Sequence, residues 1–241
     1  MKLFSIIIIS VCSICFTACQ YIGGQRVSGS GHITTQDKSV GSFNSIRSGG
    51  STNVHVMQSP TNSVKIEADD NLMPYIDVYV EGNTLYIKSK SGYNLNPSKD
   101  ITAYVSAPAF REISVSGSGD IIGDNAISGN DPMELHVSGS GNINMQLNVP
   151  KVSTDVSGSG DVTLKGQAKD FDAELSGSGK IKCFDLVTDN TTLHLSGSSD
   201  ADVNANKTIE INVSGSGSVR YKGNPTINQH ISGSGDVRKA D

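Results

Sequence analysis

The amino-acid sequence predicts an all-β fold, a single-stranded right-handed parallel β-helix, from a repeat, an apolar period of two and residue types that disfavour helices. A short phrase recurs seven times in the second half of the 241-residue chain: two apolar residues at alternate positions, Ser-Gly-Ser-Gly or a close variant, then usually Asp or Asn. Its copies begin at Ser116, Ser138, Ser157, Ser176, Ser196, Ser214 and Ser232, so the steps are 18 to 22 residues long. A period of this size is typical of a solenoid.

Each repeat alternates like an extended strand. In Ala173–Cys183, the residues of one parity are apolar or glycine, whereas the other parity holds only Glu, Ser and Lys. Extended backbone sends alternate side chains to opposite faces, so one face is apolar and the other polar. The two inward glycines of the full Ser-Gly-Ser-Gly phrase would let the wall turn a corner without crowding. Stacked steps place each strand beside its own copy, in parallel and about 4.8 Å away, and crossover sterics favour a right-handed coil.

Residues 32–110 show strand patterning without the visible repeat. Val54 and Val56 alternate with polar residues, and Gly82-Asn83 separates two alternating runs, which predicts a hairpin. We expect residues 32–110 to form irregular coils that start and cap the solenoid, because a terminal unit must close an open sheet edge. Residues 111–241 then form the regular repeats, and residues 32–241 together form the β-helix domain.

The composition fits a narrow core and excludes one class of partner. Hydrophobic residues make up 36% of the chain and Trp is absent, which suits a thin stack of Val, Ile and Leu. The net charge is −5 and no basic stripe is visible, so we expect no nucleic-acid partner. No cofactor is expected either, since no cofactor-binding motif stands out.

The chain begins with a targeting segment. Lys2 is followed by an apolar stretch, Leu3–Phe16, that is too short to span a bilayer comfortably, so residues 1–18 are interpreted as a signal peptide. Phe16-Thr17-Ala18-Cys19 resembles a bacterial lipobox, which predicts cleavage before Cys19 and a lipid on its sulfur. Phe at the first position departs from the usual Leu. The other interpretation is an ordinary secretory signal cut near Ala18.

The segment after the signal predicts a tethered envelope protein. Residues 19–31 contain the lipidated cysteine and a Gly-rich stretch that can act as a flexible tether. We expect the protein to be anchored by its lipid in the cell envelope, at the outer membrane. The lipid can sit in either the periplasmic or the surface-facing leaflet. Of the mature cysteines, only Cys183 remains beside Cys19, and its parity predicts a buried small hydrophobe without a disulfide.

An ordered series of motifs links the chain to a known family. The strings are FNSIRSGGSTNVHV, then SVKIEADDNLMPYIDVYVEGNTLYIKSK, then ITAYVSAPAFREISVSGSGDI. The series resembles the putative auto-transporter adhesin, head GIN domain family, from roughly Phe43 to the end of the chain. The resemblance implies a secreted or lipid-anchored bacterial protein, of a kind common in Bacteroidetes, with a right-handed β-helix. It implies no established activity and brings no catalytic residues.

The outward residue two positions before each phrase offers a weak candidate for a metal site. If the repeats stack in register, His136, Asp155, Glu174 and His194 lie on consecutive rungs, and all four are metal-ligand types. Rungs about 4.8 Å apart are awkward for a four-ligand cage with bonds near about 2.1 Å. The other interpretation is a solvated polar face.

A second outward column follows the glycines. It consists of Asp120, Asn142, Asp161, Lys180, Asp200, Ser218 and Asp236. Gly-x-Gly-Asp is similar to the calcium-binding nonapeptide β-roll, but that repeat needs its turn on both sides of every coil. A polar ladder beside a tight Ser-Gly corner is the favoured interpretation.

Exposed tyrosines offer a candidate interface. Tyr79, Tyr86 and Tyr104 lie on the parity opposite their strands' apolar residues, so they should point outward. If their strands are neighbours, they form an aromatic patch of the kind that marks contact surfaces. The alternative is that the loop from Ser91 to Lys99 covers them.

These features predict a membrane-anchored, non-catalytic binding or adhesion module. The membrane is contacted through the lipid on Cys19, and a glycan or protein is the expected ligand. The alternative is a self-assembling structural scaffold, for which a homo-oligomer is expected. A β-helix polysaccharide-degrading enzyme is less favoured, because the nearly uniform steps leave little length for groove-forming loops and no nucleophile–base or carboxylate pair stands out.

Overall fold

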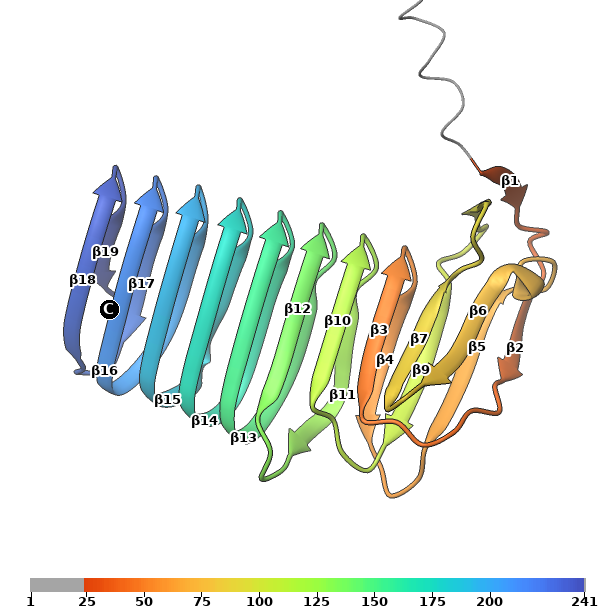
Figure 1. The fold of residues 1–241 in the computed structure, drawn as a ribbon, viewed down its shortest axis with the longest axis horizontal. Helices are drawn as coiled ribbons and strands as arrows, with labels where there is room; N and C mark the ends of the chain where they lie inside the picture. The colour runs from red at the N-terminus through yellow and green to blue at the C-terminus, as the bar shows by residue number, and fades with distance from the viewer. Residues whose placement is uncertain (1–23, 241) are drawn as a thin grey trace, which may run out of the picture.

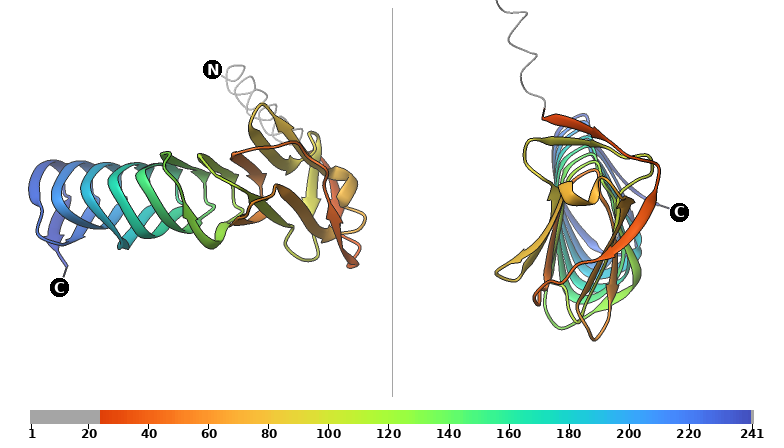
Figure 2. Two further views of the ribbon diagram at one scale, coloured as in Figure 1. Left: turned by 90° about the horizontal axis from the view of Figure 1, so that it is seen from below. Right: turned by 90° about the vertical axis from the view of Figure 1, so that its right-hand side faces the viewer.

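A computed structural model describes residues 24–240, which form one elongated solenoid (Figure 1). The chain winds through flattened coils, each made of two β-walls that meet at corners, as the end-on view in Figure 2 shows. Strands of successive coils pair in parallel, which confirms the predicted parallel β-helix. The predicted signal peptide (residues 1–18) and Cys19 lie outside the described residues. Among residues 24–240, no helix is long and apolar enough to cross a membrane.

The two walls are formed by alternate stretches of the chain, and several long strands contribute to both. Wall 1 contains β3 (Ser45–Gly50), β10 (Glu112–Gly117), β12 (Met133–Gly139), the second halves of β13 (Ile143–Gly158), β14 (Asp161–Gly177), β15 (Lys180–Gly197) and β16 (Asp200–Gly215), and β18 (Thr226–Gly233). Wall 2 contains β4 (Asn53–Gln58), β11 (Ile121–Ser128), the first halves of β13 to β16, β17 (Ser218–Lys222) and β19 (Asp236–Lys239).

The spatial order of the first coils differs from their order in the sequence. Strand β7 (Thr84–Ser89) pairs in parallel with β3, and β9 (Thr102–Ala107) pairs in parallel with β4. On their other edges, β3 pairs with β10 and β4 pairs with β11. The coil of β3 and β4 is therefore enclosed between the later coil of β7 and β9 and the first regular repeat. Its corner, Ser48–Asn53, takes the place of a Ser-Gly phrase.

Antiparallel strands cap this end of the solenoid. Strand β6 (Ile76–Glu81) pairs with β7 across the predicted Gly82-Asn83 hairpin, which is confirmed. Strand β5 (Ser63–Asp69) pairs with β9, and β2 (Ile33–Asp37) pairs with β5. A short 3₁₀ helix, η2 (Met73–Tyr75), joins β5 to β6. The antiparallel strands cover an edge that would otherwise expose parallel hydrogen-bonding groups.

Part of the segment that was predicted to be a flexible tether is structured. Strand β1 (Gln25–Ser28) pairs in parallel with β8 (Tyr93–Asn96). The fully buried Asp69 then fixes the next residues, because its carboxylate accepts hydrogen bonds from the Gly31 backbone N–H at 2.7 Å and the Ser98 backbone N–H at 2.9 Å. The Ser98 hydroxyl donates a further hydrogen bond to the same carboxylate. These contacts join three chain segments at the cap.

The core is a continuous stack of aliphatic side chains from both walls. Inward positions alternate with outward ones along each wall, as the period of two predicted, and the alternation is interrupted where a long strand turns from wall 2 to wall 1, as at residues 206–208. Cys183 is buried in this stack, as predicted, and burial raises the pKa of its thiol to about 12. The thiol therefore acts as a small hydrophobic group.

The corner glycines are required by close backbone approach. Gly158 has φ of 128°, and a Cβ atom there would lie 2.3 Å from the carbonyl oxygen of Gly139 on the preceding rung. A Cβ atom at Gly160 would lie 2.0 Å from the carbonyl oxygen of Gly141. Ser199 occupies the equivalent of the second glycine in one coil, where it is fully buried and its hydroxyl donates to the Ser196 carbonyl at 3.1 Å.

Candidate functional site

The outward column on wall 1 is aligned as the repeat predicted. The paired residues, from one rung to the next, are Ser114, His136, Asp155, Glu174, His194, Asn212 and His230. Towards the cap, Arg47 of β3 and Tyr86 of β7 continue the same column. A parallel column of phrase serines runs beside it, from Ser116 to Ser232.

The four candidate metal ligands do not converge on a common point in the structure. His136, Asp155, Glu174 and His194 follow one another along the wall, but no group of three or more His, Cys, Asp or Glu residues within 24–240 could hold a metal ion. His136 Nε2 lies 3.9 Å from the Glu134 carboxylate on its own strand. The column therefore forms an open ladder, with a shallow groove of about 440 Å³ beside His194 and His230.

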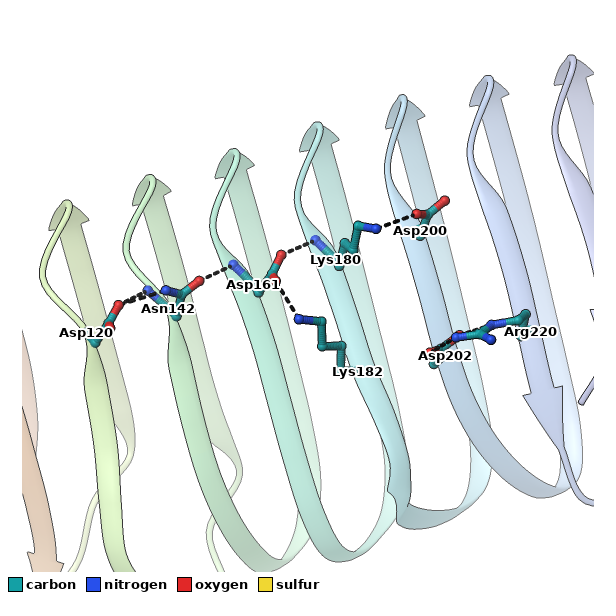
Figure 3. Close-up of polar contacts among 8 residues, drawn as sticks. All are labelled: Asp120, Asn142, Asp161, Lys180, Lys182, Asp200, Asp202 and Arg220. Atoms are coloured by element: carbon teal, nitrogen blue, oxygen red, sulfur yellow. Dashed lines mark hydrogen bonds and ion pairs between the residues drawn. The ribbon is translucent and has the colours of Figure 1, made fainter.

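The column that follows the glycines is a hydrogen-bonded ladder along the corner (Figure 3). The backbone N–H of Asn142 donates to Asp120 Oδ1 at 2.9 Å, and that of Asp161 donates to Asn142 Oδ1 at 2.9 Å. The Lys180 N–H donates to Asp161 Oδ1 at 3.1 Å. Asn53 begins the ladder by accepting from the Asp120 N–H at 3.0 Å. These four side chains therefore satisfy backbone N–H groups of the adjacent rungs, whereas the Asp200 N–H, beside Lys180, is bonded to the Gly179 carbonyl.

Ion pairs between neighbouring rungs neutralise the charges near this ladder. Lys182 Nζ lies 2.7 Å from Asp161 Oδ2, Lys180 Nζ lies 3.2 Å from Asp200 Oδ2, and Arg220 pairs with Asp202 (Figure 3). All these pairs are partly exposed, so solvent screening keeps their contribution to stability small. Lys180, Lys182 and Arg220 are therefore each paired with a carboxylate.

The structure separates the three tyrosines that were predicted to form one patch. Tyr79 and Tyr86 stack on the wall 1 side, with ring centroids 5.1 Å apart and planes at 12°. Tyr104 lies on wall 2, where it pairs with His55. Tyr79 and Tyr104 are exposed, as predicted, but the condition set for a single patch is not met, because parity fixes inward or outward and not which wall a strand joins. The loop that follows β7 places Tyr93 against Tyr75, 4.6 Å between ring centroids.

Tyr104 belongs instead to a hollow on wall 2 that the sequence did not reveal. The hollow has a volume of about 360 Å³, within the range of about 300–1,000 Å³ usual for small-ligand sites. Its floor crosses three paired strands: Lys65 of β5 is opposite Tyr104 of β9, which is opposite His55 of β4. His55 and Tyr104 have ring centroids 5.3 Å apart, and His55 Nδ1 lies 2.7 Å from Asp124 Oδ1 of β11.

An irregularity in β11 presents Asp124 to the hollow. Between Ile122, which pairs with Asn144, and Ala126, which pairs with Gln146, β11 has three residues where β13 has one. This bulge lies in the longest step of the repeat, 22 residues from Ser116 to Ser138. The extra length was the sequence signal for the hollow, but nothing in it indicated which side chains it would bring together.

Hydrogen bonds fix the bulge to β4. Asn125 Oδ1 accepts a hydrogen bond from the Gln58 backbone N–H at 2.8 Å, and Asn125 Nδ2 donates one to the Gln58 carbonyl at 2.9 Å. The Gln58 side-chain amide in turn donates to the Ser128 carbonyl and accepts from the Ser128 backbone N–H, both at 2.9 Å. A side chain held this way loses little freedom when a ligand binds beside it.

The sequence of residues 42–225 matches a family model described as putative auto-transporter adhesin, head GIN domain. The chain belongs to this family. The resemblance seen in its motifs is thereby confirmed. In this head GIN domain protein, the matched residues include both walls from β3 to β17 and every residue that lines the hollow, whereas β1, β2, β18 and β19 lie outside them.

Solved structures share the head GIN domain fold over nearly the whole chain. A putative adhesin from Bacteroides fragilis is 28% identical with a TM-score of 0.82, and the match covers 89% of this chain and all of that one. A putative lipid binding protein from Parabacteroides distasonis is 27% identical with a TM-score of 0.76, covering 90% of this chain and all of that one. A putative adhesin from the same organism is 27% identical with a TM-score of 0.70 and equal coverage. A search of curated proteins found no match.

Proposed function

We propose that this head GIN domain protein is a lipid-anchored component of the bacterial cell envelope that binds a partner without catalysing a reaction. The observation that carries the proposal is the in-register outer face, on which hydroxyl, imidazole and carboxylate groups repeat from rung to rung. Their spacing is fixed by the backbone ladder, which suits a glycan or protein ligand. Adhesin and lipid binding protein, the descriptions of the similar structures, both denote binding.

Cys19 supplies the membrane contact in this proposal. The first described residues lie at the capped end of the solenoid (Figure 1), so a lipid on Cys19 would direct the cap towards the bilayer and the regular coils away from it. We assign the protein to the outer membrane. Metabolic labelling with a palmitate analogue tests the anchor: the wild-type protein should carry the label and Cys19→Ser should not. Equal labelling of both would contradict it.

The described residues favour binding over catalysis. His55 and Asp124 form a His–carboxylate pair, but no hydroxyl or thiol within residues 24–240 is hydrogen-bonded to His55 Nε2. Cys183 lies in the core and its thiol has a pKa of about 12, so it offers no accessible thiolate. These observations support a binding module.

A binding screen of the mature chain tests the proposed function. Glycan and host-matrix arrays are probed with residues 19–241 carrying Cys19→Ser, while light scattering follows the mass over a range of protein concentrations. Capture on the arrays at constant mass supports the binding module. Mass that rises with concentration, without capture, would replace it with the self-assembling scaffold. Release of unsaturated products from pectin, alginate or glycosaminoglycans would replace it with an enzyme.

A further inference from the structure

The floor of the hollow on wall 2 is an exposed aromatic and apolar surface. Tyr104 is 39% exposed and Met57 is 44% exposed, although both lie on paired strands beside the core. The His55 ring lies beside Tyr104 at an interplanar angle of 31°. A ligand with a flat apolar face could pack on these side chains and remove them from water.

The two ends of the hollow carry opposite charges. Lys65, whose Nζ lies 4.0 Å from Asp37 Oδ1, is on the β5 side of Tyr104, and Asp124 lies beyond His55 on β11. Asp124 Oδ1 faces His55 Nδ1, whereas Asp124 Oδ2 has no hydrogen bond to any residue between 24 and 240. An anionic ligand would meet the Asp124 carboxylate and a cationic one would meet the Lys65 ammonium. The arrangement therefore suits a neutral ligand whose groups both donate and accept hydrogen bonds.

We propose that this hollow binds a single neutral hexopyranose residue of a glycan. A pyranose has one face of C–H groups, which fits against Tyr104, and hydroxyls at its edge, which can donate to Asp124 Oδ2 and accept from Lys65 Nζ. Because the bulge is already fixed by Asn125 and Gln58, Asp124 needs no reordering on binding. The proposal rests on the binding function and names the ligand class and the residues for it.

Ligand-observed saturation-transfer NMR tests this site. The mature chain with Cys19→Ser is mixed with the methyl glycosides of glucose, galactose, mannose, fucose and N-acetylglucosamine. At least one should receive saturation from the protein. Its affinity should fall about tenfold or more in Tyr104→Ala and in Asp124→Asn. Asp124→Asn preserves the size of the side chain, so it remains informative if Tyr104→Ala folds poorly.

Asp185→Asn provides the matched control for Asp124→Asn, because Asp185 is an exposed carboxylate of β15 that does not line the hollow. Its affinity should equal that of the unsubstituted protein. The site is refuted if no methyl glycoside binds, or if binding survives both substitutions in the hollow. The binding arrays, run in parallel, distinguish failure of this site from failure of the proposed function. Capture on the arrays without methyl glycoside binding would refute only the site in the hollow, whereas the absence of both would refute the binding function as well.

Discussion

The regular coils and the capped end use the same two walls but place their polar side chains in opposite ways. From β12 onwards, the outer polar positions of wall 1 stay in register from rung to rung, and corner side chains accept backbone N–H groups of their neighbours. Near the cap, the bulge in β11 breaks this regularity and brings His55, Tyr104 and Asp124 together. Strict repetition yields a ladder of equivalent positions beside a shallow groove, and a local departure from it gathers unlike side chains from separate strands.

The two regions should also differ in what destabilises them. The coils depend on backbone packing at every corner, whereas the cap depends on a few polar contacts around Asp69. Three measurements test this difference, the largest expected effect first.

Replacing a corner glycine should cause the largest loss of stability. Gly158→Ala adds a Cβ atom 2.3 Å from the Gly139 carbonyl oxygen at φ of 128°, so we expect the free energy of unfolding to fall by about 3–5 kcal/mol. In the cap hairpin, Gly82 has φ of 61° but open space around the added atom, so Gly82→Ala should cost only about 1–2 kcal/mol. Urea unfolding measures both. Equal losses would show that the rungs can move apart.

Acid should open the cap before it affects the coils. Hydrogen bonds from Ser98 and then Gly31 hold the pKa of Asp69 below its ordinary value, and Ser30 lowers the pKa of Asp70 in the same way. A carboxylate with a lowered pKa in the folded state stabilises the fold above its unfolded pKa, about 3.9, and that contribution is lost as the pH falls through the folded pKa. The protection of residues 25–31 against hydrogen exchange, relative to the intrinsic rate at each pH, should therefore fall below about pH 4.

Asp69→Asn provides the control for the acid prediction. An amide keeps one acceptor oxygen but turns donor hydrogens towards the Ser98 N–H, if nitrogen replaces Oδ2, or towards the Gly31 N–H, if it replaces Oδ1, so the same residues should exchange faster even at neutral pH. Their exchange should no longer depend on pH through this carboxylate. Uniform acceleration across all coils would instead show that cap and coils unfold as one unit.

The sequence predicted the regular half in detail and the capped end only in outline. The repeat determined the parallel pairing, the outer column with His136 and His194, and the burial of Cys183, because each follows from a period and a parity. The order of the first coils did not follow, since Ser48–Asn53 lacks the full phrase that would mark it as a corner.

The hollow was not predictable for the same physical reason. Parity predicted that Tyr104 points outward, but its wall depends on whether β9 joins β4 or β3, which no local pattern specifies. The long step from Ser116 to Ser138 indicated extra residues, yet a bulge becomes informative only when the neighbouring strands are known. The residues of the proposed site come from four strands spread over positions 55 to 124.

Replacing Thr154, inside the regular coils, should have the smallest effect on the free energy of unfolding, and Thr154→Val should raise it, whereas the glycine substitutions lower it. The Thr154 hydroxyl is buried in wall 1, between Leu135 and Ala173 of the adjacent rungs, and has no hydrogen-bond partner among the described residues. Thr154→Val keeps the shape and removes the unpaired polar group, so the free energy of unfolding should rise by about 1 kcal/mol. Thr154→Ala, which also removes a methyl group, should lower it through the void left behind. Destabilisation by both would mean that the hydroxyl is paired in solution, for instance by a buried water, and that the regular coils hold specific polar contacts in their core as the cap does.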